Sequence, residues 1–149
     1  MSTIMIGDEV SELATDRSLS DCVGEEEIEP RRVLVVDDNR SHLSLLQVLL
    51  DWIPDLQVSY ATTGKDAVEL LRTCKYGLLM TDFRMPGMDG IDLASIAKGL
   101  SPKMEIILVT ADILSQDMLT RVASAGIDKV LTKPVRINEI LSIVARYQS

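Results

Sequence analysis

The chain has 149 residues, of which 46% are hydrophobic and 26% are charged, as is usual for a single soluble globular domain. No apolar run approaches the ~20 residues of a membrane span, and the N-terminus lacks the basic start and long apolar core of a signal peptide. The net charge of −8, without a basic patch in the sequence, argues against a nucleic-acid partner.

The two cysteines, Cys22 and Cys74, are too few for a disulfide framework. We expect both to be free thiols, one in a loose tail and the other half-buried on a helix. A reducing cytoplasm fits this composition, and we expect no membrane partner.

The first 30 residues differ from the rest in charge. They hold nine acids and one base, whereas residues 31–149 hold fourteen of each and are neutral overall. We therefore expect residues 1–30 to form an acidic, flexible tail and residues 31–149 to form one domain. Within the tail, Ile6, Val10 and Leu13 have the spacing of a short amphipathic helix that would dock on a partner or on the domain, but the composition favours disorder.

From residue 31 onward, strand-like apolar runs alternate with helix-like patterns. The runs predict strands over residues 33–36, 56–60, 76–81, 104–109 and 128–131. The patterns predict one helix that carries Leu45 and Leu49 and stops before Pro54, and others over residues 64–73, 89–98, 113–125 and 137–147, with Gly126 just past the end of the fourth. This alternation predicts an α/β fold, a flavodoxin-like (βα)5 doubly wound sheet of five parallel strands in the order 2-1-3-4-5.

Ligands of such sheets bind at the carboxyl ends of the strands. Five polar residues follow or end the predicted strands there, namely Asp37, Asp38, Asp82, Thr110 and Lys133. Three neighbouring carboxylates repel one another unless a cation lies between them, and hard oxygen ligands suit Mg²⁺, with Mn²⁺ as a second candidate. A carboxylate in this setting can act as a nucleophile and form an aspartyl phosphate, whose charge the metal and the lysine would neutralise.

Each of these residues also has a plain structural interpretation. Alone, Asp37 or Asp38 is more often the N-cap of the following helix, and Asp82 a turn acid. Thr110 would be a strand-end hydroxyl, and Lys133 a solvated base. Their joint placement at successive strand ends of one sheet favours the chemical interpretation.

Four short motifs occur along the chain in the order VLVVDDN, LMTDFRMPGMDG, LVTA and VLTKP. Together they resemble the receiver domain of two-component response regulators, the CheY-like family, over residues 33 to about 147. The resemblance implies that Asp82 is the phosphoacceptor. It also implies that Asp37, Asp38 and Asp82 hold Mg²⁺, with the backbone carbonyl of Arg84 as a further ligand.

The same resemblance assigns the phosphoryl-binding and switch positions. Thr110, Ala111 and Lys133 would contact the phosphoryl group, and the bond before Pro134 would be cis. The family often has an aromatic residue three places before the lysine, and this chain has Val130 there. A valine has no ring to rotate inward, so the usual aromatic readout is in doubt.

Two charged residues flank the expected site, Arg84 two places after Asp82 and Asp112 two places after Thr110. We expect them to pair across the mouth of the site and to slow hydrolysis of the phosphoryl group, although solvated side chains are an equal alternative. His42, the single histidine, is expected to be a surface residue of the first helix.

The sequence therefore predicts a signalling switch rather than an enzyme acting on other substrates. A histidine kinase or phosphotransfer protein would supply the phosphoryl group. Because no output or DNA-binding element follows the last predicted helix, the signal would pass through a downstream protein, through the acidic tail, or through a domain outside this sequence. We expect a monomer or a weak homodimer. Two alternatives stay open, a Mg²⁺-dependent aspartyl-phosphate phosphohydrolase of the haloacid dehalogenase type and a pseudo-receiver that binds partners without phosphorylation.

Overall fold

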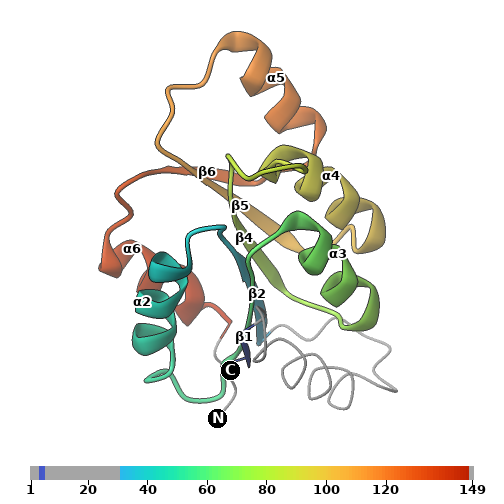
Figure 1. The fold of residues 1–149 in the computed structure, drawn as a ribbon. Coiled ribbons are helices and arrows are strands. Elements are labelled where there is room, and N and C mark those ends of the chain that lie inside the picture. The colour runs from blue at the N-terminus through green and yellow to red at the C-terminus, as the bar shows by residue number, and fades with distance from the viewer. Residues whose placement is uncertain (1–3, 6–30, 148–149) are drawn as a thin grey trace.

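The computed structural model describes residues 4–5 and 31–147 (Figure 1). One parallel sheet runs through the molecule in the order β1-β3-β2-β4-β5-β6. Without β1 this is the order 2-1-3-4-5, so the predicted flavodoxin-like topology is confirmed. The strands are β1 (Ile4–Met5), β2 (Arg32–Val36), β3 (Gln57–Ala61), β4 (Leu78–Asp82), β5 (Glu105–Thr110) and β6 (Lys129–Thr132).

Helices cover both faces of the sheet, with α2 and α6 on one face and α3, α4 and α5 on the other (Figure 1). In the described part of the chain, no helix is long and apolar enough to cross a bilayer. The helices are α2 (Arg40–Leu50), α3 (Gly64–Thr73), α4 (Gly90–Leu100), α5 (Gln116–Ser124) and α6 (Ile137–Ala145).

Side-chain alternation along the central strands divides the core into two clusters. Leu34 and Leu79 point to the cluster under α3, α4 and α5, whereas Val35 and Met80 point to the cluster under α2 and α6. All residues of β2 and β4 are buried. This burial on both faces explains why their sequences are continuous apolar runs and why the strand ends are fixed in space.

The helix ends follow local hydrogen-bonding signals. Asn39 caps α2, because its side chain accepts from the backbone N–H groups of Ser41 and His42. The fourth predicted helix begins later than expected, at Gln116, because Ser115 caps it by accepting from the Met118 N–H group.

Strand β1 was not predicted. Ile4 and Met5 pair in parallel with Ser59 and Tyr60 of β3, so the N-terminal residues add a sixth strand at the edge of the sheet. Two residues are too short a segment to show a periodic pattern, which is why no sequence signal indicated this strand. The segment with Ile6, Val10 and Leu13, for which the composition favours disorder over a short helix, lies outside the described residues.

Cys74 is also different from the expectation. It is buried at the C-terminal end of α3 and takes part in a disulfide bond, so the prediction of a free thiol is wrong at this position. Sequence spacing alone does not show which cysteines meet in space. Cys22 lies outside the described residues.

Candidate functional site at the carboxyl edge of the sheet

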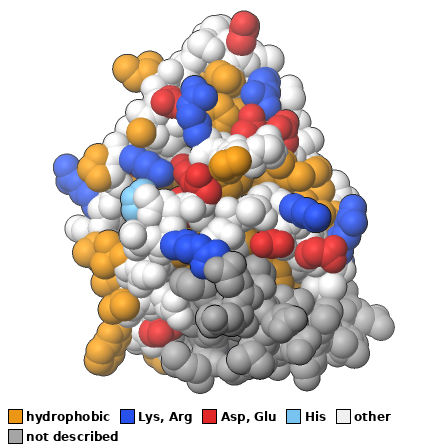
Figure 2. All heavy atoms as spheres, in the orientation of Figure 1, with side chains coloured by type: hydrophobic (Ala, Val, Ile, Leu, Met, Phe, Trp, Pro, Cys, Tyr) orange, Lys and Arg blue, Asp and Glu red, His pale blue; other side chains and the backbone are white. Residues whose placement is uncertain are grey.

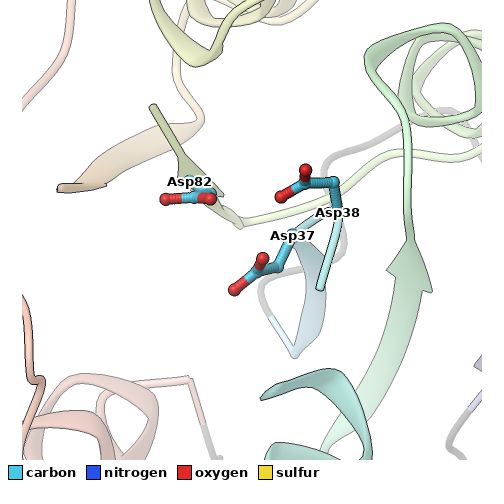
Figure 3. A group of neighbouring side chains, drawn as sticks. All are labelled: Asp37, Asp38 and Asp82. Atoms are coloured by element: carbon cyan, nitrogen blue, oxygen red, sulfur yellow. The ribbon is translucent and has the colours of Figure 1, made fainter. Parts of the chain in front are cut away.

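Three aspartates meet where β2 and β4 end side by side. Asp37 and Asp38 follow β2, and Asp82 is the last residue of β4. One carboxylate oxygen from each lies within 4.8 Å of the others, and Figure 3 shows the three side chains around a common space. Hard anionic oxygens at this spacing fit a small divalent cation such as Mg²⁺.

Asp37 is the most constrained of the three acids. Its side chain is mostly buried; Oδ1 accepts from the Asn39 N–H group at 2.9 Å and Oδ2 lies 3.1 Å from His42 Nδ1. Burial raises the pKa of Asp37, and the charge of Asp82 adds to this, although the bonds to Asn39 and His42 and the charge of Lys133 oppose it. The surroundings of Asp37 thus disfavour its negative charge, and a bound cation would offset this effect.

Asp82 has a cationic partner within the chain. Lys133 follows β6, and its Nζ lies 2.8 Å from Asp82 Oδ1, which also accepts from the Phe83 N–H group at 3.1 Å. The Lys133 backbone N–H donates to the carbonyl of Thr110, which ties the lysine to the end of β5. The peptide bond between Lys133 and Pro134 is cis, as the resemblance implies.

The remaining predicted positions lie around this pair. Thr110 is buried at the end of β5, and its Oγ1 accepts from the Asp112 N–H group at 3.0 Å. Ala111 is exposed and lines the same cavity as Asp82 and Lys133. The structure therefore brings the predicted acids, threonine, alanine and lysine to one edge of the sheet.

Arg84 and Asp112 pair as the sequence predicted. Arg84 Nε lies 2.5 Å from Asp112 Oδ2; the Arg84 side chain is largely exposed, whereas the Asp112 side chain is 36% exposed. The Arg84 guanidinium also lies over the Phe83 ring, 5.2 Å from its centroid. The pair joins the loop that follows Asp82 at the end of β4 to the loop that follows Thr110 at the end of β5.

The plain structural interpretation of the acid pair fails in the structure. Neither Asp37 nor Asp38 caps α2, because Asn39 does so.

Val130 is half-buried on β6 and packs against the core cluster that includes Val122 of α5. That position therefore holds a small side chain in the core where the resemblance implies a rotating ring.

Two residues near the acids have contacts that the sequence did not reveal. His42 is exposed, yet it contacts Asp37 because the first turn of α2 begins close after this acid. Gly90, the first residue of α4, would place a Cβ only 2.2 Å from the Asp82 carbonyl oxygen. The second glycine in MPGMDG, Gly90, was a usable signal of this close approach, since a close backbone approach requires a residue without Cβ.

Comparisons with known proteins agree on one family. The family model for the response regulator receiver domain matches residues 33–145. A response regulator receiver protein of Anaeromyxobacter sp. is 35% identical over 113 residues, which cover 76% of this chain and 47% of the relative. The transcriptional regulatory protein ZraR of Klebsiella oxytoca is 33% identical over 109 residues, which cover 72% of this chain and 24% of the relative.

A solved structure gives the same result. The CheY-like receiver domain protein of Methanospirillum hungatei matches with a TM-score of 0.71 and 26% identity, covering 80% of this chain and 93% of that one. The chain thus spans most of an isolated receiver domain but less than half of these two curated relatives. The chain belongs to the response regulator receiver domain family and carries the receiver domain of a two-component system.

Proposed function

We propose that this chain is a phosphorylation-controlled switch whose phosphoacceptor is Asp82. The carrying observation is the Asp82 carboxylate between the acid pair and Lys133 Nζ, with Oδ1 and Nζ 2.8 Å apart. A carboxylate oxygen attacks the phosphorus of a phosphohistidine on a histidine kinase or phosphotransfer protein. The bond from phosphorus to the imidazole nitrogen breaks, its electron pair stays on the imidazole, and the ring takes up a proton.

The donor set fits Mg²⁺ or Mn²⁺. Asp37, Asp38, Asp82 and the backbone carbonyl of Arg84 would hold the ion. When bound, the ion supplies positive charge for the oxygens of the transferring phosphoryl group. The raised pKa of Asp37, caused first by burial and then by the charge of Asp82, supports a cation at this position.

The other residues serve the phosphoryl group once it is attached. Lys133 exchanges its contact with the carboxylate for one with a phosphoryl oxygen, and the Ala111 backbone borders the same space. The Thr110 hydroxyl, which accepts from the Asp112 N–H group, turns to donate to the phosphoryl group. Because Val130 replaces the usual aromatic, the loop after β5 becomes the principal route of the signal.

Arg84 and Asp112 set how long the signal lasts. Their ion pair bridges the two loops that border Asp82, where it hinders the water that hydrolyses the phosphoryl group.

The chain thus acts as a timed switch in the cytoplasm rather than as an enzyme on other substrates. It has a receiver domain over residues 31–149 and an acidic N-terminal segment over residues 1–30, of which Ile4 and Met5 join the sheet. It signals to a partner protein and is a monomer or a weak dimer.

The test is mass measurement after incubation with acetyl phosphate and Mg²⁺. We expect the natural chain to gain one phosphoryl group and Asp82→Asn to gain none. The control Asp89→Asn, at an acid of the following loop that caps α4, should gain one as the natural chain does. No gain in mass would favour the pseudo-receiver, and repeated turnover of phosphomonoesters would favour the phosphohydrolase.

A further inference from the structure

Three hydrogen bonds join Asp37 to the start of α2 in a closed ring. The Asn39 N–H group donates to Asp37 Oδ1 at 2.9 Å, and Asn39 Oδ1 accepts from the His42 N–H group at 3.2 Å. The His42 ring returns to the acid, with Nδ1 3.1 Å from Asp37 Oδ2. The cap that begins α2 therefore also fixes the backbone from which the imidazole reaches the acid cluster.

The imidazole is the donor in its contact with Asp37. An ionised carboxylate can only accept, so the ring proton lies on Nδ1. The His42 side chain is 51% exposed, and Figure 2 shows this single histidine of the chain in pale blue at the surface. It nevertheless lines the same cavity as Asp37, Asp82 and Lys133. The histidine thus lies at the boundary between solvent and the predicted phosphoacceptor site.

The two bonds to Asp37 fix the plane of its carboxylate. The torsion about the Cβ–Cγ bond of an aspartate has broad preferences, so a carboxylate held at one oxygen still turns about this bond. Asp37 is held at both oxygens, by donors from Asn39 and His42. A carboxylate offers about four acceptor sites, so these bonds leave room for a cation. The acid is therefore oriented before a cation arrives, which lowers the entropic cost of binding.

We propose that His42 is a positioning residue of the predicted cation site, whose Nδ1–H group holds the Asp37 carboxylate in the orientation that binds Mg²⁺. The inference rests on the proposed function, because Asp37 is a ligand of that site. A residue that orients a metal ligand by a hydrogen bond affects metal affinity nearly as much as a ligand does, typically by about 10–100-fold. The strength of the cation site then depends on the side chain at position 42.

Direct ligation of the metal is the rival role for this imidazole. Carboxylates and carbonyls suit Mg²⁺, whereas imidazole suits metals such as Ni²⁺ and Zn²⁺. The geometry favours the positioning role, because Nδ1 already faces a carboxylate oxygen and carries its proton. The acids that share a common space are Asp37, Asp38 and Asp82, which supply the oxygen ligands without the ring.

The experiment measures the Mg²⁺ affinity of the full chain by calorimetric titration without a phosphodonor. In His42→Ala we expect a loss of about tenfold, the lower end of the range for such partners, because the imidazole is half-exposed. His42→Asn should restore most of the affinity, since its amide nitrogen is bonded to Cγ, as Nδ1 of the imidazole is. Ser41→Ala, at the neighbouring residue of the same turn, is the matched control and should bind like the natural chain.

Two results of this titration would overturn the proposal. One is an unchanged Mg²⁺ affinity in His42→Ala, and the other is an equal loss in His42→Ala and His42→Asn. A second titration, with Ni²⁺, tests the rival role. A loss in His42→Ala that is far larger for Ni²⁺ than for Mg²⁺ would identify the ring as a ligand and would also overturn the positioning role.

The rate of labelling by acetyl phosphate gives an independent readout. A positioning role lowers the occupancy of the cation site but not the chemistry of a full site, so His42→Ala should approach the natural rate in saturating Mg²⁺. At the Mg²⁺ concentration that half-saturates the natural chain, a site that is about tenfold weaker should give a rate roughly fivefold lower. A rate that stays equally low at every Mg²⁺ concentration would contradict the proposal.

The two measurements separate this inference from the proposed function. If acetyl phosphate never labels Asp82 but the Mg²⁺ affinities change as expected, the phosphoacceptor assignment fails while the role of His42 stands. If Asp82 is labelled and His42→Ala binds Mg²⁺ like the natural chain, the proposed function stands and this inference fails. A natural chain that binds no Mg²⁺ would overturn the cation site and the inference together.

Discussion

The Arg84 guanidinium and the Asp112 carboxylate form an ion pair between the loop after β4 and the loop after β5, with Nε 2.5 Å from Oδ2. The same aspartate donates its backbone N–H to Thr110 Oγ1 at 3.0 Å. The pair is therefore connected to the residue that would sense the phosphoryl group. A movement of Thr110 toward the phosphoryl group would loosen the Asp112 loop and the ion pair together.

Arg84→Ala should speed the loss of phosphate from Asp82. Exposed ion pairs contribute about 0–1 kcal/mol, so we expect a rate increase of up to about fivefold. Asp112→Ala should give a similar increase, and the double variant should add little, because both changes remove one interaction. The measurement is the decay of labelled phosphoprotein after the donor is removed. Arg72→Ala, on α3, is the control, and an unchanged rate in Arg84→Ala would contradict the role.

Lys133→Met should slow phosphorylation of Asp82. The substitution keeps much of the length of the side chain but removes the cation that lies 2.8 Å from Asp82 Oδ1. Loss of one group that stabilises developing charge typically costs about a hundredfold in rate. The initial rate of labelling by acetyl phosphate measures this. Lys129→Met, at an exposed lysine of β6, the strand before Lys133, should leave the rate unchanged, and a similar rate in both variants would exclude a role for Lys133.

Divalent cation should stabilise the fold through the acid cluster. Adding Mg²⁺ at about 100 times its dissociation constant should raise the free energy of unfolding by about 2.7 kcal/mol. Asp38→Asn, which removes a carboxylate of the cluster, should lose most of this gain, whereas Asp117→Asn on α5 should keep it. Thermal unfolding in Mg²⁺ and in EDTA provides the measurement. An equal gain in both variants would place the ion elsewhere.

Alanine substitution at two glycines of α4 should change the stability of the fold in opposite directions. At Gly90 the new Cβ would lie 2.2 Å from the Asp82 carbonyl oxygen, so we expect a loss of about 1–3 kcal/mol from overpacking. At Gly99 nothing lies within 4 Å, and alanine should stabilise the helix by about 0.5–1 kcal/mol. Urea unfolding of the two variants tests the pair. If Gly90→Ala were as stable as Gly99→Ala, the close approach beside Asp82 would be wrong.

Alkaline pH should unfold the protein through its three tyrosines. Burial raises the pKa of Tyr76 to about 12, with the Ser59 hydrogen bond and Arg32 opposing it, and burial also raises the pKa values of Tyr60 and Tyr147. The unfolded chain releases these protons from about pH 10. The stability contribution is therefore full below pH 10 and falls as the pH rises toward 12.

Absorbance of tyrosinate and circular dichroism should consequently change together in a pH titration. Tyr76→Phe removes one of the three groups, so the steepness of the alkaline loss of stability should decrease. Tyrosinate absorbance that rises near pH 10 while the circular dichroism stays native would show that the tyrosines are accessible in the folded protein.

Much of this protein follows from sequence because its signals are local. Apolar runs that are buried on both faces alternate with helical patterns, and right-handed crossovers then leave few strand orders to choose from. Since parallel strands end at a common edge, the positions of Asp37, Asp82 and Thr110 in the sequence already place them near one another. Even the pairing of Arg84 with Asp112 follows from their equal offsets from two strand ends.

Tertiary structure decided the contacts between segments that carry no such signal. The pairing of Ile4 with Ser59 and the bonded state of Cys74 depend on distant parts of the chain that meet only after folding. The contact of His42 with Asp37 and the closeness of Gly90 to Asp82 depend on where each helix begins. The cavity that Asp82, Ala111 and Lys133 line likewise exists only once α2 and α6 lie on the sheet, because the sequence records which side chains are apolar but not which of them stay uncovered.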